Sequence, residues 1–416
     1  MEQREALRKL ASEWMEFANL PVMSERKTLW GSLNAKHAKR PMVLVETCLM
    51  TDYVGEDELH GEDPYLRGIE KLMIEYTRHA REIGDDFVLE PYFLLPWELT
   101  RDNFGVEVPE QTVKDAYGDE LSIRWSHPVS TPEDSKLLHE RTFSVDRETT
   151  QNRAQLLNEM FGDILPVRIG GVDPVYGAGG GYSPFTGLFL PDITLNLFRL
   201  IGMNNMYLWL YEYPDEYHRL MGMITRDFIN MVRYLEEQDL LADNNNNVLT
   251  GGRYGYNEDG TELQRPIKAK DLWLWCTFEE TTVISPECFS EFILPYAKLA
   301  TEIFGKVYYG CCENLDKRYL DIKREIEHIE GVSVAPFTDV TKLCEMLEDD
   351  VILSCKPHPA FIAYINPDWE SAKKNIVDTV NARKNPNLEF ILRDVYRTYG
   401  NRKVLADWVE MTRALI

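Results

Sequence analysis

The sequence predicts an α/β protein with a (β/α)8 or TIM-barrel fold, preceded by an N-terminal helical extension and interrupted by loop insertions. Short, continuous apolar runs, which are typical of buried parallel strands, alternate with longer stretches of helical periodicity. Repeated β–α units of this kind imply a parallel sheet, and about eight of them imply a closed barrel. No internal repeat and no linker rich in Pro, Gly or Ser divides the 416 residues. The 44% hydrophobic content is ample for one large core.

Composition excludes several classes of function. The net charge of −24 would repel nucleic acid, which is bound by clustered Lys and Arg side chains. No segment approaches about 18 uninterrupted apolar residues, so we expect no membrane partner. The N-terminal run MEQREALRKLASEWMEF is charged and helical, unlike a signal sequence, and seven cysteines in such a chain favour reduced thiols. We therefore expect a cytoplasmic protein that binds a small molecule.

Residues 1–40 are expected to form a helical arm. Apolar residues recur at helical spacing until Pro21 ends the helix, and a charged segment follows. We interpret the arm as a cap on the barrel; an arm over a partner subunit is the alternative, which leaves a homodimer open. Residues 41–416 are then the TIM-barrel catalytic domain, in which residues 100–150 form an insertion with a hairpin and a helix.

The alternation of apolar runs and helical stretches places the elements in order. Strands are predicted at residues 42–50, 87–95, 165–169, 272–278, 307–311, 332–335, 351–354 and 388–392. Helices are predicted at residues 65–83, 153–160, 204–213, 214–238, 286–303, 319–330, 340–347, 368–383 and 403–415. Two Gly-rich stretches, 170–192 and 248–260, are expected to form loops at the rim of the barrel.

Sulfur and carboxylate groups close three successive predicted strands. Glu280 ends a tryptophan-rich run, Cys312 follows VYYGC, and Cys355 ends VILSC. The carboxyl ends of parallel strands meet at the barrel rim, where active sites form. Catalytic zinc takes three ligands from Cys, His, Asp or Glu and keeps a fourth position open. We therefore predict Cys312, Glu280 and Cys355 as ligands of a shared Zn²⁺.

Alternatives accompany each of these residues. Cys311 precedes Cys312 on a predicted strand, where neighbouring side chains point to opposite faces, so at most one of the two should reach the metal. Cys355 could simply pack in the core, and Glu280 could cap a helix or pair with an arginine. Glu313 could replace Glu280 or accept a hydrogen bond from a ligand.

Three residues are predicted to act in the chemistry. These are Glu280, Glu313 and His358, the last of which lies between two prolines and would be a ligand or a proton donor. Aromatic residues of the two Gly-rich stretches are predicted to stack on a substrate ring, with ordinary packing as the alternative. They are Tyr176, Tyr182, Phe185, Tyr254 and Tyr256.

The C-terminal part of the chain resembles the uroporphyrinogen decarboxylase superfamily. The run ISPECFSEFILPYAKLATEIFGKVYYGCCENL is similar to that superfamily's Ser-Pro helix and the strand after it. VSVAPFTDVTKLCEMLEDDVILSCKPHPAFI resembles the units that follow. The likeness covers about 150 C-terminal residues in detail and the remainder only in its rhythm of elements. The first strand, KRPMVLVETCLM, lacks the decarboxylases' Arg-x-Ala-Gly-Arg type motif, which favours the corrinoid-linked methyltransferase branch.

This resemblance implies a zinc-dependent methyltransferase of an O-demethylase system. It would move a methyl group from a methoxylated, aromatic substrate to the Co(I) corrinoid of a separate protein, because this chain has no Asp-x-His-x-x-Gly corrinoid motif. The sequence departs from the branch in having Tyr309 or Gly310 where a histidine is usual, and no cysteine after Cys355. A cofactor-free decarboxylase like uroporphyrinogen decarboxylase is the alternative function.

Overall fold

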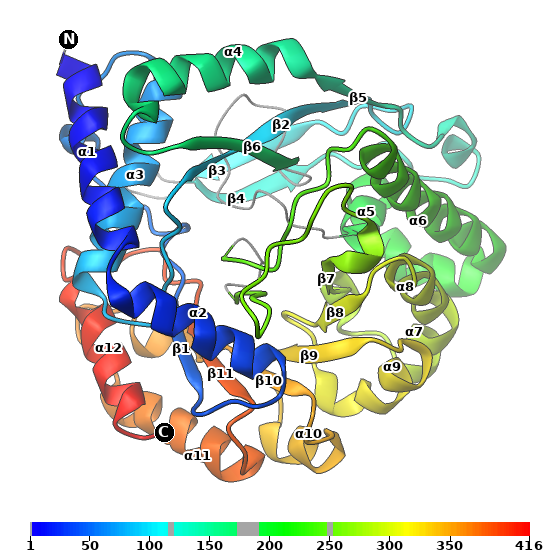
Figure 1. Cartoon of the computed structure of the whole chain (residues 1–416). Coiled ribbons are helices and arrows are strands. Elements are labelled where there is room, and N and C mark those ends of the chain that lie inside the picture. Colours follow the sequence, from blue (N-terminus) through cyan, green and yellow to red (C-terminus); the bar gives the residue numbers. More distant parts are fainter. Residues whose placement is uncertain (1, 115–119, 173–190, 248–252) are drawn as a thin grey trace.

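The computed structural model describes residues 2–114, 120–172, 191–247 and 253–416, and Figure 1 shows strands toward the middle of the molecule with helices around them. The helices are α1 Glu2–Ala18, α2 Pro21–Asn34, α3 Pro64–Glu82, α4 Arg147–Leu157, α5 Ile193–Glu212, α6 Pro214–Glu237, α7 Pro286–Phe292, α8 Leu294–Thr301, α9 Tyr319–Glu325, α10 Val340–Met346, α11 Trp369–Arg383 and α12 Lys403–Arg413. Within the described residues, no helix is long and apolar enough to cross a membrane.

The largest sheet has six parallel strands. Their order is β1-β11-β10-β9-β8-β7, so the first strand of the chain pairs with the last. The strands are β1 Met42–Val45, β7 Trp273–Cys276, β8 Lys306–Tyr309, β9 Ile329–Val334, β10 Ile352–Cys355 and β11 Leu388–Leu392. All residues of β1, β10 and β11 are buried, as expected of parallel strands covered by helices on the outside.

Five further strands of the described residues form two small sheets. In the first, β2 pairs in parallel with β6 and antiparallel with β5, and in the second, β3 pairs antiparallel with β4. Their bounds are β2 Phe93–Arg101, β3 Glu110–Lys114, β4 Glu120–Trp125, β5 Phe143–Asp146 and β6 Val167–Val172. The antiparallel pair β3 and β4 lies within the stretch 100–150 that the sequence marks as an insertion.

The predicted α/β class with a mostly parallel sheet is confirmed, whereas a closed eight-stranded sheet is not found among the described residues. At the free edge of β7, where a further strand of a closed sheet would pair, a side chain makes backbone hydrogen bonds instead. The Asn244 side chain accepts from the backbone N–H of Trp273 at 3.0 Å and donates to its carbonyl at 2.9 Å. An asparagine thereby takes the place of a strand beside β7, which a periodicity search cannot detect.

Two predicted elements differ for identifiable reasons. The predicted helix 286–303 is divided into α7 and α8, because Pro295 lies in the first turn of α8 and has no N–H to continue the ladder. The predicted strand 87–95 begins only at Phe93. The residues before it are fixed by helix α2, where the Arg26 guanidinium donates to the Phe87 carbonyl at 2.7 Å.

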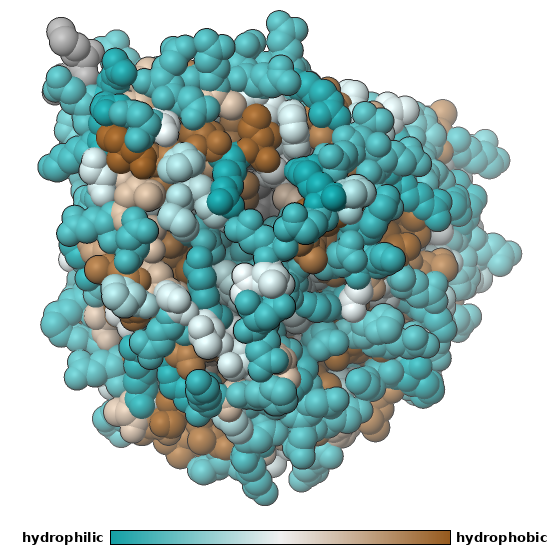
Figure 2. Space-filling view, viewed as in Figure 1, coloured by the Kyte–Doolittle hydropathy of each residue, from teal (hydrophilic) through white to brown (hydrophobic). Residues whose placement is uncertain are grey.

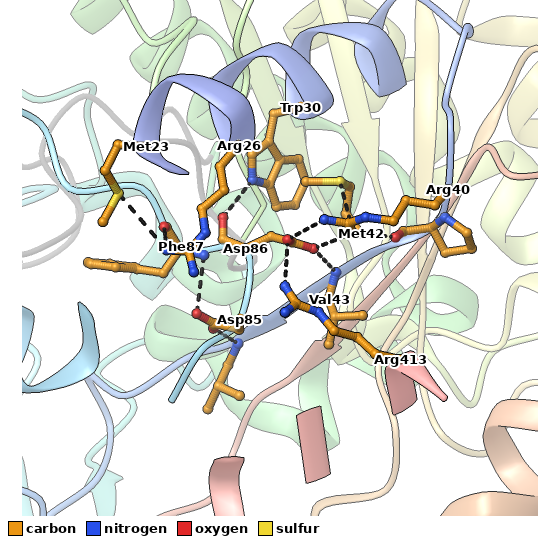
Figure 3. A network of polar contacts seen from close by, with 12 residues as sticks. Met23, Arg26, Trp30, Arg40, Met42, Val43, Asp85, Asp86, Phe87 and Arg413 are labelled. Atoms are coloured by element: carbon orange, nitrogen blue, oxygen red, sulfur yellow. Dashed lines mark hydrogen bonds and ion pairs between the residues drawn. The ribbon is translucent and has the colours of Figure 1, made fainter. Parts of the chain in front are cut away.

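A buried carboxylate ties the two ends of the chain together (Figure 3). Asp86 accepts hydrogen bonds from Arg40 at 2.7 and 2.8 Å, from Arg413 of α12 at 2.8 Å and from the Val43 N–H of β1 at 2.8 Å. The Trp30 indole of α2 donates to the Asp86 carbonyl at 2.9 Å. Helix α2 is therefore held against β1, and Figure 1 shows α2 crossing in front of that strand.

We expect Asp86→Asn to lower the free energy of unfolding by about 2–3 kcal/mol, because it leaves two arginines without their buried counter-charge. The decrease in unfolding free energy is limited because both guanidinium groups are partly exposed and can be solvated by water. Urea denaturation followed by circular dichroism measures it. Asp163→Asn is the matched control, since Asp163 pairs with Arg8 on the surface and its loss should not shift the midpoint. Equal midpoints for the two variants would contradict this account of the network.

Candidate active site

Chemically reactive side chains collect where the parallel strands end. Glu46 directly follows β1, Glu279 comes shortly after β7, and Cys311 and Cys312 come shortly after β8. The next strands end in the same manner on cations, which are Lys356 after β10 and Arg393 after β11. Carboxyl ends of parallel strands share one edge, so this end of the sheet is the place to look for an active site.

Glu279, Cys311 and Cys312 form the candidate metal site. One ligand atom from each lies within 4.8 Å of the other two, and the two sulfurs are 3.7 Å apart. Two thiolates on a tetrahedral zinc, with Zn–S bonds of about 2.3 Å, would lie about 3.8 Å apart. The Glu279 Oε2 atom is buried and has no hydrogen-bond partner among the described residues. The three residues therefore fit a Zn²⁺ ion with a fourth position left open.

The sequence prediction that only one of the two cysteines could reach a metal is wrong. Strand β8 ends at Tyr309, and Gly310 has φ +96°, a conformation that favours glycine. A side chain there would also come within 2.5 Å of the Ser333 carbonyl. The alternation of side chains therefore stops before Cys311, and the turn brings both sulfurs to one side.

The charge state of the cysteines depends on their surroundings. The hydrogen bond with Cys312, followed by burial, raises the pKa of the Cys311 thiol, whereas the nearby Arg393 cation lowers it. Metal ligation requires the thiolate, and a neighbouring cation stabilises that form. Arg393 thus favours deprotonation of Cys311 when a metal binds.

Glu280 is not part of the candidate metal site, and Glu279 takes the place predicted for it. The Glu280 Oε2 atom accepts from the Thr194 hydroxyl of α5 at 2.7 Å. Burial raises the pKa of the Glu280 carboxyl to about 7. Both glutamates lie in a single 3-10 turn, Glu279–Thr281, whose curvature the sequence does not reveal.

Cys355 is also misassigned as a metal ligand. Its sulfur lies 3.7 Å from the Thr379 hydroxyl of α11, within the core between sheet and helices, and burial raises the pKa of the Cys355 thiol to about 11. Alternation along β10 turns Ser354 to the other face, where its hydroxyl accepts from Tyr308 at 2.7 Å. The final residue of a parallel strand can therefore point toward the covering helices and away from the candidate metal site.

Glu313 holds the cysteine turn in place. Its fully buried carboxylate accepts from the Thr277 hydroxyl at 2.9 Å and from the Tyr309 hydroxyl at 3.0 Å. Burial raises the pKa of this carboxyl. Because these bonds link the segment after β8 to the ends of β7 and β8, Glu313 is a positioning residue. His358 is exposed, accepts from the Ala360 N–H at 3.2 Å, and does not join the candidate metal site.

The prediction that Tyr254 and Tyr256 line the rim is corrected. Asn257, in the same segment, accepts from Lys306, the first residue of β8, so this loop lies at the amino ends of the strands. Both tyrosines pack in the core beneath α2, and Tyr256 also borders a separate cavity of about 240 Å³. Tyr176, Tyr182 and Phe185 lie outside the described residues.

The sequence reasoning missed Lys356 and Arg393. The Lys356 ammonium donates to Tyr308 at 2.7 Å and to Ser354 at 2.5 Å, and Arg393 Nε lies 3.2 Å from Glu46 Oε2. A usable signal existed, because both residues come within two positions of the end of a predicted apolar strand, in VILSCK and EFILR.

Comparisons with known proteins give a distant structural likeness. No protein-family model and no curated protein matches the sequence. Among solved structures, a methyltransferase from Methanosarcina mazei is similar with a TM-score of 0.49 and 11% sequence identity, over 93% of this chain and 97% of that chain.

We expect zinc-loaded protein to retain about one Zn²⁺ per chain after dialysis against a weak chelator. Glu279→Gln, Cys311→Ser and Cys312→Ser each remove one ligand and should weaken retention by about tenfold or more. Elemental analysis of the dialysed proteins measures the retained metal.

The controls are variants of Glu280 and Cys355, which the sequence predicts as metal ligands but which lie outside the candidate metal site. Glu280→Gln and Cys355→Ser should keep the metal, because their side chains contact Thr194 and Thr379 instead. Zinc loss in Glu280→Gln together with zinc retention in Glu279→Gln would show that the assignment is inverted.

Proposed function

We propose that this protein is a zinc-dependent methyltransferase that moves a methyl group from a methoxylated aromatic substrate to the Co(I) corrinoid of a separate protein. The observation that carries the proposal is the convergence of Glu279, Cys311 and Cys312 at the carboxyl ends of parallel strands. The resemblance of residues 284–361 to the uroporphyrinogen decarboxylase superfamily, together with the missing arginine-rich motif in the first strand, supports the reaction class.

The chemistry requires activation of a poor leaving group. A zinc ion bound at this site would act as a Lewis acid on the ether oxygen, which becomes negatively charged as the methyl group departs. The two cysteines and Glu279 would hold that ion. Glu313 keeps the cysteine turn attached to β7 and β8, so the ligands are positioned before substrate binds.

Exposed apolar side chains on the loops beyond the strands support a partner protein. They follow β7, β9, β10 and β11, and all therefore belong to the carboxyl-end side of the sheet. They are Val283, Phe337, Tyr364, Ile365, Tyr396 and Tyr399. Figure 2, viewed as in Figure 1 with α2 in front, shows a mostly hydrophilic face with small separate hydrophobic areas. A protein that carries the corrinoid would dock over the apolar loops and bring it to the candidate metal site.

One observation favours a second function. Arg393 is a partly buried cation near Cys311, and the buried Lys356 follows the neighbouring strand; the two could hold a carboxylate that is lost as CO₂. This is the decarboxylase alternative, which needs no metal. The grouping of two thiols with a carboxylate makes it the second choice.

The proposal is tested with zinc-loaded protein, a panel of methoxybenzenes and free cob(I)alamin, which replaces the corrinoid protein. We expect methyl transfer, followed as loss of the Co(I) absorbance. Cys312→Ser should lower the rate by about 100-fold or more, because Lewis-acid activation contributes several kcal/mol to the barrier. Cys355→Ser should transfer methyl at the wild-type rate.

The same reactions distinguish the two functions. No transfer from any methoxybenzene by zinc-loaded protein would overturn the methyltransferase proposal. Release of CO₂ from an aromatic acid in the presence of a strong chelator would establish the decarboxylase instead.

A further inference from the structure

Lys356 is a buried cation for which the described part of the chain supplies no anionic partner. The residue is 5% exposed, and its ammonium group donates to the hydroxyls of Tyr308 and Ser354. No carboxylate among the described residues lies within 4.0 Å of it. An ammonium group has three N–H donors, so one is left for a ligand. Burial of a charge is costly unless the charge is paired, which makes this arrangement unusual for a purely structural lysine.

Arg393 follows β11, the strand paired with β10, and presents further donors at the same end of the sheet. Its Nε and Nη1 atoms are buried and form no hydrogen bond with the described residues, although Glu46 lies nearby. The guanidinium lies over the Trp275 ring, with 5.8 Å to the ring centroid, and near Cys311. Neighbouring strands relate the two cations: Tyr308 accepts from Lys356, and its register partner Trp275 lies under the Arg393 guanidinium.

Guanidinium and ammonium groups are donors that proteins commonly use to bind carboxylates. The planar guanidinium can bind both oxygens of a carboxylate, and an ammonium group adds a point charge at the same place. A neutral methyl ether would leave the same donors unsatisfied.

We propose that the methyl donor carries a carboxylate group, which Lys356 and Arg393 bind beside the candidate metal site. This inference rests on the proposed function and narrows its substrate class to methoxylated aromatic acids. The carboxylate would be held at the ends of β10 and β11, and the methoxy group would be directed toward the cysteine turn after β8.

The test compares 3-methoxybenzoate with 3-methoxybenzyl alcohol by isothermal titration calorimetry on zinc-loaded protein. We expect wild type to bind the acid at least tenfold more tightly than the alcohol. Lys356→Met should abolish this preference by weakening binding of the acid alone. Lys342→Met is the control and should change neither affinity, because Lys342 is a surface residue paired with Asp339.

Two results would overturn the inference. One is equal affinity of unmodified protein for acid and alcohol, which needs no variant and so does not depend on the folding of Lys356→Met. The other is a Lys356→Met variant that binds the acid as tightly as wild type does, with a urea midpoint at least equal to that of wild type, which shows that the variant is folded.

The inference and the proposed function fail in different ways. Transfer of methyl from the alcohol as efficiently as from the acid would overturn the carboxylate inference and leave the methyltransferase intact. Lys356-dependent binding of the acid without methyl transfer to cob(I)alamin would support the carboxylate site and overturn the methyltransferase.

Discussion

The turn at Gly310 is the constraint on which the candidate active site depends. Its positive φ ends β8 earlier than the apolar run suggests, and its close approach to the Ser333 carbonyl leaves no room for a side chain. Cys311 and Cys312 therefore leave the strand together and their sulfurs lie side by side. Glu313 fixes the other end of this turn through Thr277 and Tyr309. A short backbone irregularity thus converts two adjacent cysteines into a chelating pair.

Buried cations at the two ends of the parallel strands differ in the kind of partner they have. Toward the amino ends of the strands, the fully buried Arg253 pairs with Glu389 at 3.0 Å and packs over the Trp273 ring. Toward the carboxyl ends, Lys356 has only hydroxyl partners, and Arg393 keeps unused donors. The first pair has the geometry of a structural element whose desolvation is offset within the protein. Among the described residues, Lys356 lacks a partner carboxylate of this kind, and this difference is the ground for the ligand inferred there.

Patterns confined to one segment were predictable, whereas contacts between distant segments were not. The strand at 388–392 and the helix at 368–383 follow from apolar runs and helical spacing, and both match β11 and α11 within a residue. The sequence predicts Glu280 as a metal ligand, whereas the structure places Glu279 with the two cysteines. Both lie in a 3-10 turn, in which side chains one residue apart point in different directions. The placement of Tyr256 at the amino ends depends on α2, which is more than 200 residues earlier and whose Asn34 donates to the Tyr256 carbonyl.

Strand β8 contacts both Lys356, the inferred carboxylate anchor, and Glu313, which holds the cysteine turn. Tyr308 and Tyr309 are adjacent on this strand and therefore face opposite sides. Tyr308 contacts Lys356, which is the inferred anchor of the carboxylate, and Tyr309 contacts Glu313, which holds the cysteine turn. Because both contacts originate from one buried strand, the separation between the anchor and the candidate metal site is set by rigid backbone. A donor of matching length would have its ether oxygen aligned by binding alone, so the strand itself would select among methoxylated acids by the position of the methoxy group on the ring.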